Sequence, residues 1–300
     1  MNDKTLFGGI EAGGTKFVCA VGGGPENIVD EIRFPTATPD ETLARVCDFF
    51  APYIRAGQLQ CIGLGSFGPV DLDPASATFG FITSTPKPHW QNANVLGFLQ
   101  NKLGLLCIMD TDVNAAALGE FTWGASRDYD PSLYLTVGTG VGGGCIKDGK
   151  PYHGLLSPEM GHIRLVHDLK RDPFRGACPF HHDCFEGLAS GPAIEARLGR
   201  RAETLADNDP FWDIEADYIA QALTNYIFVL SPKKIVLGGG VMQKGFLFPK
   251  IRRRVGELLN GYLQSEILLT ELDEYIVTPA LGSRAGVLGA IALAMQMETS

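Results

Sequence analysis

The sequence predicts an α/β protein made of two related lobes. Apolar runs rich in β-branched residues alternate with helical patterns along the 300 residues, as in α/β folds. Residues 7–21 and 134–146 share one plan: a strand, a glycine-rich tight turn and a second strand. The composition is 45% hydrophobic, which is enough for a large core. We therefore expect one lobe at 1–122 and another at 123–300, with the boundary segment near 121–131.

The first lobe is expected to contain strands and two helical segments. The first of these helical segments begins near Asp40, a residue type that favours the start of a helix. In chain order we expect strands at 8–11 and 17–21, a helix at 40–54, a strand leading into a Gly-Pro loop at 61–73, and a strand, polar turn and alanine-rich helix at 104–124.

The second lobe repeats this alternation. The expected elements are a strand, glycine loop and strand at 132–150, a helix at 217–230, a strand ending in glycines at 233–242, and a terminal helix within 282–297. We expect the terminal helix, at about 285–298, to pack back on the first lobe.

Charge and hydropathy exclude several partners. The net charge is −9 and no basic run occurs, so we expect no nucleic acid partner. No apolar stretch reaches the ~20 residues that span a bilayer, and the N-terminal segment lacks a signal-peptide pattern. Five of the seven cysteines are scattered in mostly apolar contexts and are expected to be buried thiols. We therefore expect a cytoplasmic protein.

The glycine loops indicate a phosphate site of an uncommon kind. In GIEAGGTK, Lys16 falls one position late for a P-loop. The glycines of GTGVGG fit the spacing GxGxxG, but a strand rather than a helix follows them. A β-hairpin with a glycine turn can instead direct backbone N–H groups at an anion. Two such loops, together with GGG at 238–240, favour phosphate binding over ordinary tight turns.

Eight short stretches, taken together and in this order, resemble one protein family specifically. The chain resembles sugar kinases of the ROK family, and most of all their bacterial fructokinase branch. The matching stretches are GGIEAGGTK, GLGSFGPVDL, DTDVNAAALGE, LTVGTGVGGG, SPEMGH, the CPFHHDCFEG loop, LGGGV and LGSRAGVLGA. The resemblance implies two actin/hexokinase-like (ribonuclease H-like) lobes around a central cleft. It also implies phosphorylation of a hexose by ATP with Mg²⁺, fructose 6-phosphate as the product, and a homodimer.

Asp112 is the expected general base. It follows a strand end, where carboxylates of α/β clefts meet their ligands. Local sequence supports an N-cap of the next helix equally well, and the resemblance selects the base. The resemblance further implies contacts to ATP from Gly13, Gly14, Thr15, Lys16, Gly138, Thr139, Gly140, Gly239, Gly240 and Gly282. Lys16 on a phosphate and Lys16 as a solvated hairpin lysine remain equal alternatives.

The resemblance implies sugar contacts from Glu159 and His162 of SPEMGH, from Glu186 and from the expected base Asp112. Two positions depart from the family pattern. Thr111 stands where many members have asparagine, and Glu11 stands where they have aspartate. The first change bears on a sugar hydrogen bond and the second on the metal–phosphate region.

Residues 178–186 read CPFHHDCFE and predict a metal site. Cys178, His181 and Cys184 have the spacing CxxHxxC, and His162 supplies a fourth ligand from upstream. Two sulfur and two nitrogen ligands suit tetrahedral Zn²⁺, and four protein ligands make the site structural rather than catalytic. If one ring nitrogen of His162 binds zinc, the other is set as a donor to a sugar hydroxyl. His182 remains a rival of His181.

Three other functions stay open. The first is a kinase acting on glucose, mannose or N-acetylmannosamine. The second is a sugar-sensing repressor, which needs a DNA-binding segment before the first glycine loop and is disfavoured by the acidic charge. The third is a non-catalytic sugar-binding or regulatory protein, against which the retained Asp112 argues.

Overall fold

The structure is a computed structural model that describes residues 6–297. The chain forms two units, the first made of residues 6–127, 150–157 and 280–297 and the second of 128–149 and 158–279. The sequence placed the division at 122/123 and did not predict the return of 150–157 to the first unit. The expectation that the N-terminal segment lacks a signal peptide concerns residues 1–5 in part. Those residues, and residue 298 of the expected terminal helix, lie outside the described residues.

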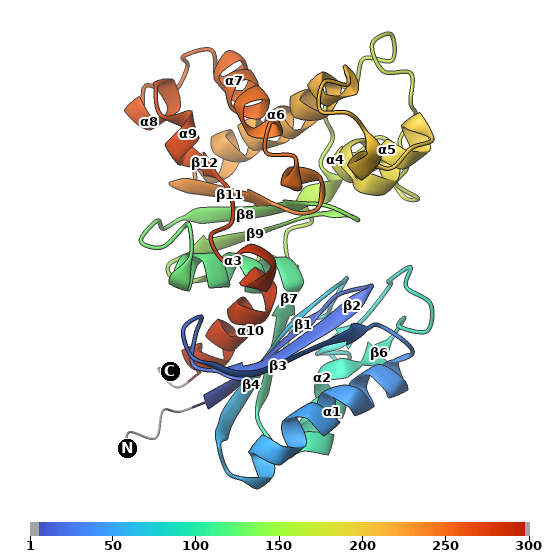
Figure 1. The fold of residues 1–300 in the computed structure, drawn as a ribbon, viewed down its shortest axis with the longest axis vertical. Coiled ribbons are helices and arrows are strands. Elements are labelled where there is room, and N and C mark those ends of the chain that lie inside the picture. The colour runs from blue at the N-terminus through green and yellow to red at the C-terminus, as the bar shows by residue number, and fades with distance from the viewer. Residues whose placement is uncertain (1–5, 298–300) are drawn as a thin grey trace. The chain divides into compact units, whose positions relative to one another are not determined.

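The first unit contains a five-stranded sheet in the order β3-β2-β1-β4-β7. Strands β1, β2 and β3 are antiparallel, whereas β1, β4 and β7 run parallel. The elements are β1 (Leu6–Ala12), β2 (Lys16–Gly22), β3 (Ile28–Pro35), α1 (Pro39–Arg55), β4 (Leu59–Ser66), β5 (Phe81–Ile82), β6 (Ala93–Asn94), α2 (Val95–Leu103), β7 (Cys107–Thr111), α3 (Asp112–Trp123), β10 (Lys150–Pro151), the 3₁₀ helix η4 (Gly282–Arg284) and α10 (Ala285–Gln296). Figure 1 shows α1 and α10 on opposite faces of this sheet.

Alternation along the strands explains the two covered faces. On β2, Phe17 and Cys19 belong to a core shared with α1 and α2, whereas Val18 and Ala20 pack with α10. Successive side chains of a strand point to opposite faces, so both faces of β2 must be apolar. The continuous hydrophobic run of this strand is therefore the signature of a sheet buried on both sides.

Glycines allow α10 to lie against the sheet and against α3. A Cβ on Gly63 of β4 would lie 1.8 Å from the Ala290 carbonyl oxygen, and one on Gly289 would lie 1.6 Å from the Ala115 carbonyl oxygen. Neither position therefore accepts a side chain. The buried Glu120 then secures the entry to the terminal helix, because its carboxylate accepts hydrogen bonds from the backbone N–H groups of Ala280 (3.0 Å) and Leu281 (2.9 Å).

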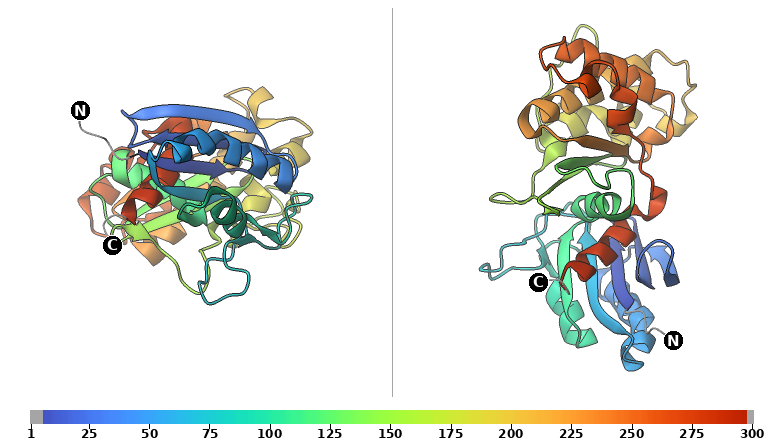
Figure 2. Two further views of the ribbon diagram at one scale, coloured as in Figure 1. Left: turned by 90° about the horizontal axis from the view of Figure 1, so that it is seen from below. Right: turned by 90° about the vertical axis from the view of Figure 1, so that its left-hand side faces the viewer.

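The second unit has its own mixed sheet, in which β8 lies between β9 and β11, and β11 pairs in parallel with β12. Figures 1 and 2 show α6 and α7 covering one face of this sheet. The elements are β8 (Ser132–Val137), β9 (Val141–Lys147), η1 (Met160–His162), α4 (Phe185–Ala189), α5 (Gly191–Leu198), η2 (Ala202–Thr204), α6 (Phe211–Leu230), β11 (Lys234–Gly238), η3 (Val241–Gln243), α7 (Leu247–Leu259), α8 (Glu266–Leu269), α9 (Leu272–Tyr275) and β12 (Ile276–Val277).

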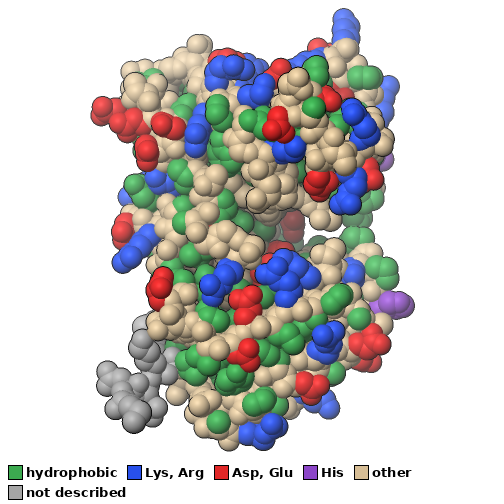
Figure 3. Space-filling model, viewed as in Figure 1, with side chains coloured by type: hydrophobic (Ala, Val, Ile, Leu, Met, Phe, Trp, Pro, Cys, Tyr) green, Lys and Arg blue, Asp and Glu red, His purple; other side chains and the backbone are tan. Residues whose placement is uncertain are grey.

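The expectations about cysteines, membrane spans and surface charge can be compared with the fold. All seven cysteines are free; six are buried and Cys47 is half-buried. No helix in the described part of the chain combines the length and apolarity that crossing a membrane requires. On the face drawn in Figure 3, lysine and arginine side chains are interspersed with aspartate and glutamate side chains.

Candidate active site and metal centre

Asp112 is the first residue of α3, directly after the carboxyl end of β7. The helix is capped by Thr111, whose hydroxyl oxygen accepts a hydrogen bond from the Asn114 N–H at 3.1 Å. Capping was the alternative role for Asp112, and the structure gives that role to its neighbour. It also gives a local reason for threonine at 111, since threonine is a favoured N-cap residue and its hydroxyl satisfies an otherwise unpaired helix N–H.

The parallel strands bring three segments of the first unit to one edge of the sheet. β1, β4 and β7 end at Ala12, Ser66 and Thr111, and the Phe67 N–H donates to the Ala12 carbonyl at 2.8 Å. The first glycine loop and the turn before Asp112 both follow these strand ends. This is the edge at which ligands bind in open parallel sheets.

Within the first glycine loop, the residues expected to contact ATP have different roles. The Gly13 N–H donates to the Lys16 carbonyl at 2.9 Å and so closes the hairpin. That amide is used within the protein, which leaves Gly13 a turn-forming role. A Cβ on Gly14 would meet nothing within 4 Å, so packing does not require glycine there. The absence of a Cβ leaves room for close approach of a ligand at this position. Thr15 is exposed beside it.

Glu11, near the end of β1, is half-buried, and its carboxyl group lies against the start of α10. Burial raises the pKa of its carboxyl, opposed by the charges of Lys16 and Arg33 and by a hydrogen bond from the Val287 backbone. A Cβ on Gly286 would lie 2.6 Å from the carboxyl carbon, so glycine there makes room for the longer side chain. Among the described residues, Oε2 of Glu11 is buried without a hydrogen-bond partner. A carboxylate oxygen of this kind suits a hard cation such as Mg²⁺.

Two glycine loops of the second unit lie side by side. A Cβ on Gly138 would lie 3.3 Å from the Gly240 nitrogen. Gly239 has a φ of +100°, and a Cβ there would lie 2.3 Å from the Val137 carbonyl oxygen, so only glycine fits. Gly240, by contrast, faces open space. The exposed Thr139 stands between Gly138 and Gly140. Gly282 belongs to the first unit, where it begins η4 with a φ of +56°.

Three of the four expected sugar contacts gather in the second unit. Burial raises the pKa of Glu159, the nearby His162 lowers it, and the charge of Glu186 raises it. Glu186 also accepts a hydrogen bond from the Val141 N–H at 3.0 Å, which ties it to the strand that follows the second glycine loop. The fourth, Asp112, belongs to the first unit.

His162, Cys178, His181 and Cys184 form a compact group, which we call the Cys₂His₂ cluster. Their ligand atoms all lie within 4.8 Å of one another. His162 Nδ1 is 3.5 Å from Cys184 Sγ, and Cys178 Sγ is 3.7 Å from His181 Nδ1. Tetrahedral Zn²⁺ with Zn–N of ~2.1 Å and Zn–S of ~2.3 Å separates its ligands by about 3.4–3.8 Å. The donor set and its spacing therefore fit zinc.

The structure selects His181 over His182. The His182 N–H donates to the Cys178 carbonyl at 2.9 Å, and its own carbonyl accepts from the Cys178 N–H at 3.2 Å. His182 takes the left-handed backbone conformation, with a φ of 54°, at the end of this tight turn. His182 thus shapes the loop through its backbone, and the His181 side chain joins the cluster.

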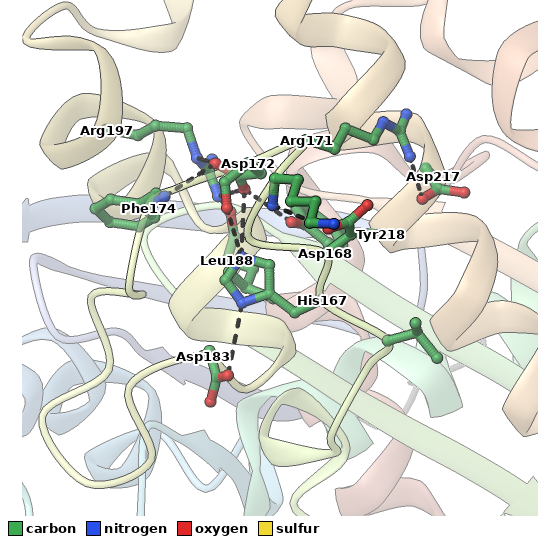
Figure 4. A network of polar contacts seen from close by, with 12 residues as sticks. His167, Asp168, Arg171, Asp172, Phe174, Asp183, Leu188, Arg197, Asp217 and Tyr218 are labelled. Carbon is green, nitrogen blue, oxygen red and sulfur yellow. Dashed lines mark hydrogen bonds and ion pairs between the residues drawn. The ribbon is translucent and has the colours of Figure 1, made fainter.

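A polar network holds this loop from behind, and sequence reasoning missed it. Arg164 donates to the His181 carbonyl at 2.8 Å and pairs with Asp183. Figure 4 shows the continuation: His167 lies between Asp183 and Asp172. Asp172 in turn binds the largely buried Arg197 at 3.1 Å. These residues are spread over 164–197 without the spacing of a recognised motif, so no sequence pattern marked them.

Glu215 of α6 should make stability depend on pH. It is fully buried with both carboxylate oxygens unpaired among the described residues. Burial raises its pKa well above 4.5, Arg197 lowers it and Asp172 raises it further. The folded state thus holds a proton that the unfolded state has released. The free energy of unfolding should therefore fall as pH rises from about 4.5 through the raised pKa, by at most ~1.4 kcal/mol per pH unit.

Glu215→Gln should remove this dependence. The variant should match the wild type near pH 4.5 and exceed it at pH 8, as measured by urea unfolding across that range. Glu203→Gln, at an exposed carboxylate, is the matched control and should leave the pH dependence unchanged. Parallel pH profiles for Glu215→Gln and the wild type would contradict the assignment.

The chain is similar to known proteins over nearly its whole length. A model of the ROK family matches residues 7–297. The putative fructokinase of Bacillus subtilis (strain 168) is 50% identical over 97% of this chain and 96% of its own length. The fructokinase of Pediococcus pentosaceus is 43% identical, covering 96% and 97%. The structure of a ROK hexokinase from Thermus thermophilus superposes with a TM-score of 0.79 at 26% identity, covering 98% of this chain and all of that one. The resemblance expected from the motifs is confirmed, and the chain belongs to the ROK family.

Proposed function

We propose that this protein transfers the terminal phosphoryl group of ATP to the 6-hydroxyl of D-fructose. The observation that carries the proposal is the set of fructokinases to which the chain is 41–50% identical over at least 96% of its length. The chain also keeps a carboxylate, Asp112, at the carboxyl end of a parallel strand, and it groups Glu159, His162 and Glu186.

In this proposal each group has a separate task. Asp112 accepts the hydroxyl proton as the sugar oxygen attacks the γ-phosphorus, and ADP leaves with the bridging oxygen. Glu159, His162 and Glu186 hydrogen-bond the other hydroxyls and so orient the attacking one. Phosphates are received by the glycine loops, at Gly14 and Gly240, where glycine leaves open space. Thr139 and Lys16 add a hydroxyl and a positive charge.

Two metal ions belong to the proposal. Mg²⁺ bound with ATP would supply positive charge to the phosphates. Oε2 of Glu11, which is buried and has no hydrogen-bond partner among the described residues, is suited to lie near it. Zn²⁺ would be held by the Cys₂His₂ cluster. Because all four ligands would come from the protein, the zinc site would be structural and would shape the loop that carries Glu186.

The proposal also includes a cytoplasmic location and a homodimer. Seven free cysteines suit a reducing compartment. The homodimer rests on the family resemblance alone, and light scattering coupled to size-exclusion chromatography measures it.

A coupled ATP assay over a panel of hexoses tests the function. We expect kcat/KM to be highest for fructose among fructose, glucose, mannose and N-acetylmannosamine. A higher value for another sugar would replace the substrate and keep the reaction. Sugar binding without turnover of any hexose would favour the sugar-binding or regulatory alternative.

A further inference from the structure

A histidine that no motif marked is joined to the strand that precedes Asp112. His153 lies on the segment 150–157, which returns from the second unit to the first. Its Nε2 is 2.9 Å from Oδ2 of Asp110, and its Nδ1 is 3.2 Å from the Ser157 hydroxyl. The imidazole is about one-third exposed, whereas the Asp110 side chain is almost fully buried. A buried carboxylate therefore receives a partner from a segment 43 residues along the chain.

Asp110 uses its second oxygen on the turn that carries Asp112. Oδ1 accepts hydrogen bonds from the Thr111 N–H at 2.7 Å and from the Asn114 side-chain amide at 2.7 Å. Thr111 caps α3, and Asn114 lies in the first turn of that helix. One carboxylate thus connects the strand end, the cap, the first helical turn and the segment of His153. Asp112 sits within this set of contacts.

The direction of the pKa shift of His153 agrees with its close contact to Asp110. The hydrogen bond to Asp110 raises the pKa of His153, burial opposes this, and the Asp110 charge adds to the rise. The groups that hydrogen-bond the pair include Ser157 on the same segment, the Thr111 N–H and the Asn114 side-chain amide, all uncharged. The Nε2–H donates to Asp110 in the protonated imidazole and in the neutral Nε2–H tautomer, with Ser157 able to serve Nδ1 in both.

We propose that His153 is a positioning residue for phosphoryl transfer, which holds Asp110 and through it the turn that presents Asp112 as the base. This inference rests on the proposed function. His153 acts on the reaction through two other residues and touches no reacting atom. A base whose supporting contacts are lost reaches the hydroxyl proton less often, so the effect should fall on kcat.

Glutamine and asparagine at position 153 form the discriminating pair. The amide nitrogen of glutamine takes the place of Nε2 and can still donate to Asp110. The shorter amide of asparagine takes the place of Nδ1 and reaches only Ser157. We expect His153→Gln to keep kcat within about 2-fold of the wild type. His153→Asn should lower kcat by about 10-fold and change KM for fructose by less than about 3-fold.

An imidazole titration by NMR supplies a readout that does not depend on activity. The His153 signal, identified by its loss in His153→Gln, should titrate above pH 6.5 in the wild type and shift down in Asp110→Asn. Equal kcat in the Gln and Asn variants, or an effect confined to KM, would overturn the inference. So would a titration that Asp110→Asn leaves unchanged. A wild type that phosphorylates no hexose would overturn the proposed function instead, and the titration would still decide whether the His153–Asp110 contact exists.

Discussion

Replacing Asp112 with asparagine should lower kcat for fructose phosphorylation by roughly 10³-fold, within the range of general-base catalysis. Asparagine keeps the size of the side chain, and its carbonyl can still accept the hydrogen bond that the Val113 N–H gives to Asp112 at 2.9 Å. What it cannot do is take the proton of the attacking hydroxyl. The loss should therefore appear in kcat, measured by the coupled ATP assay, while calorimetry should show fructose binding close to that of the wild type.

Thr111→Ser is the matched control for Asp112→Asn. Serine keeps the hydroxyl that caps α3, so activity should stay within a few-fold of the wild type. Thermal unfolding should be nearly unchanged in both variants, because the cap and the Asp110 contacts remain. Near-normal kcat in Asp112→Asn would refute Asp112 as the base. A large loss in Thr111→Ser as well would assign the effect to the turn.

Removing the His181 imidazole should lower both the zinc content of the protein and its free energy of unfolding. We expect about one zinc per chain in the purified wild type, and well below that in His181→Ala, which leaves three ligands. If free zinc is present at about 100 times its dissociation constant, the loss of zinc binding lowers the free energy of unfolding by ~3 kcal/mol. Metal analysis and urea unfolding measure both effects, and a chelator should destabilise the wild type but not His181→Ala.

His182→Asn separates the metal from the loop. Asparagine tolerates the left-handed conformation that His182 adopts, so the turn should survive. This variant should keep its zinc, as should Cys47→Ser, at a half-buried cysteine outside the cluster. Full zinc in His181→Ala together with zinc loss in His182→Asn would exchange the two assignments.

Prediction from sequence worked where the information is local. The β-strand and glycine-turn plan, the helix after Asp112 and the spacing of CPFHHDCFE are patterns of neighbouring residues, and each was recognised in the chain. Prediction did not reach contacts made across the fold. Glu11 with Gly286, and Asp110 with His153, join residues whose separation in sequence carries no pattern. The return of 150–157 to the first unit makes the second of these contacts possible, and chain path rather than periodicity decides it.

By itself, the sequence determined the fold class and the family, because hydrophobic periodicity and short motifs depend only on residues close in the chain. The choice of Asp112 as the expected base came from the family resemblance and stays a prediction. The tertiary structure decided which of two adjacent histidines joins Cys178 and Cys184, because the left-handed turn at His182 sets their different positions. It also decided that Thr111 caps α3, the role that had been the alternative for Asp112. Such choices depend on backbone conformation and on partners brought from distant segments, and these exist only once the chain has folded.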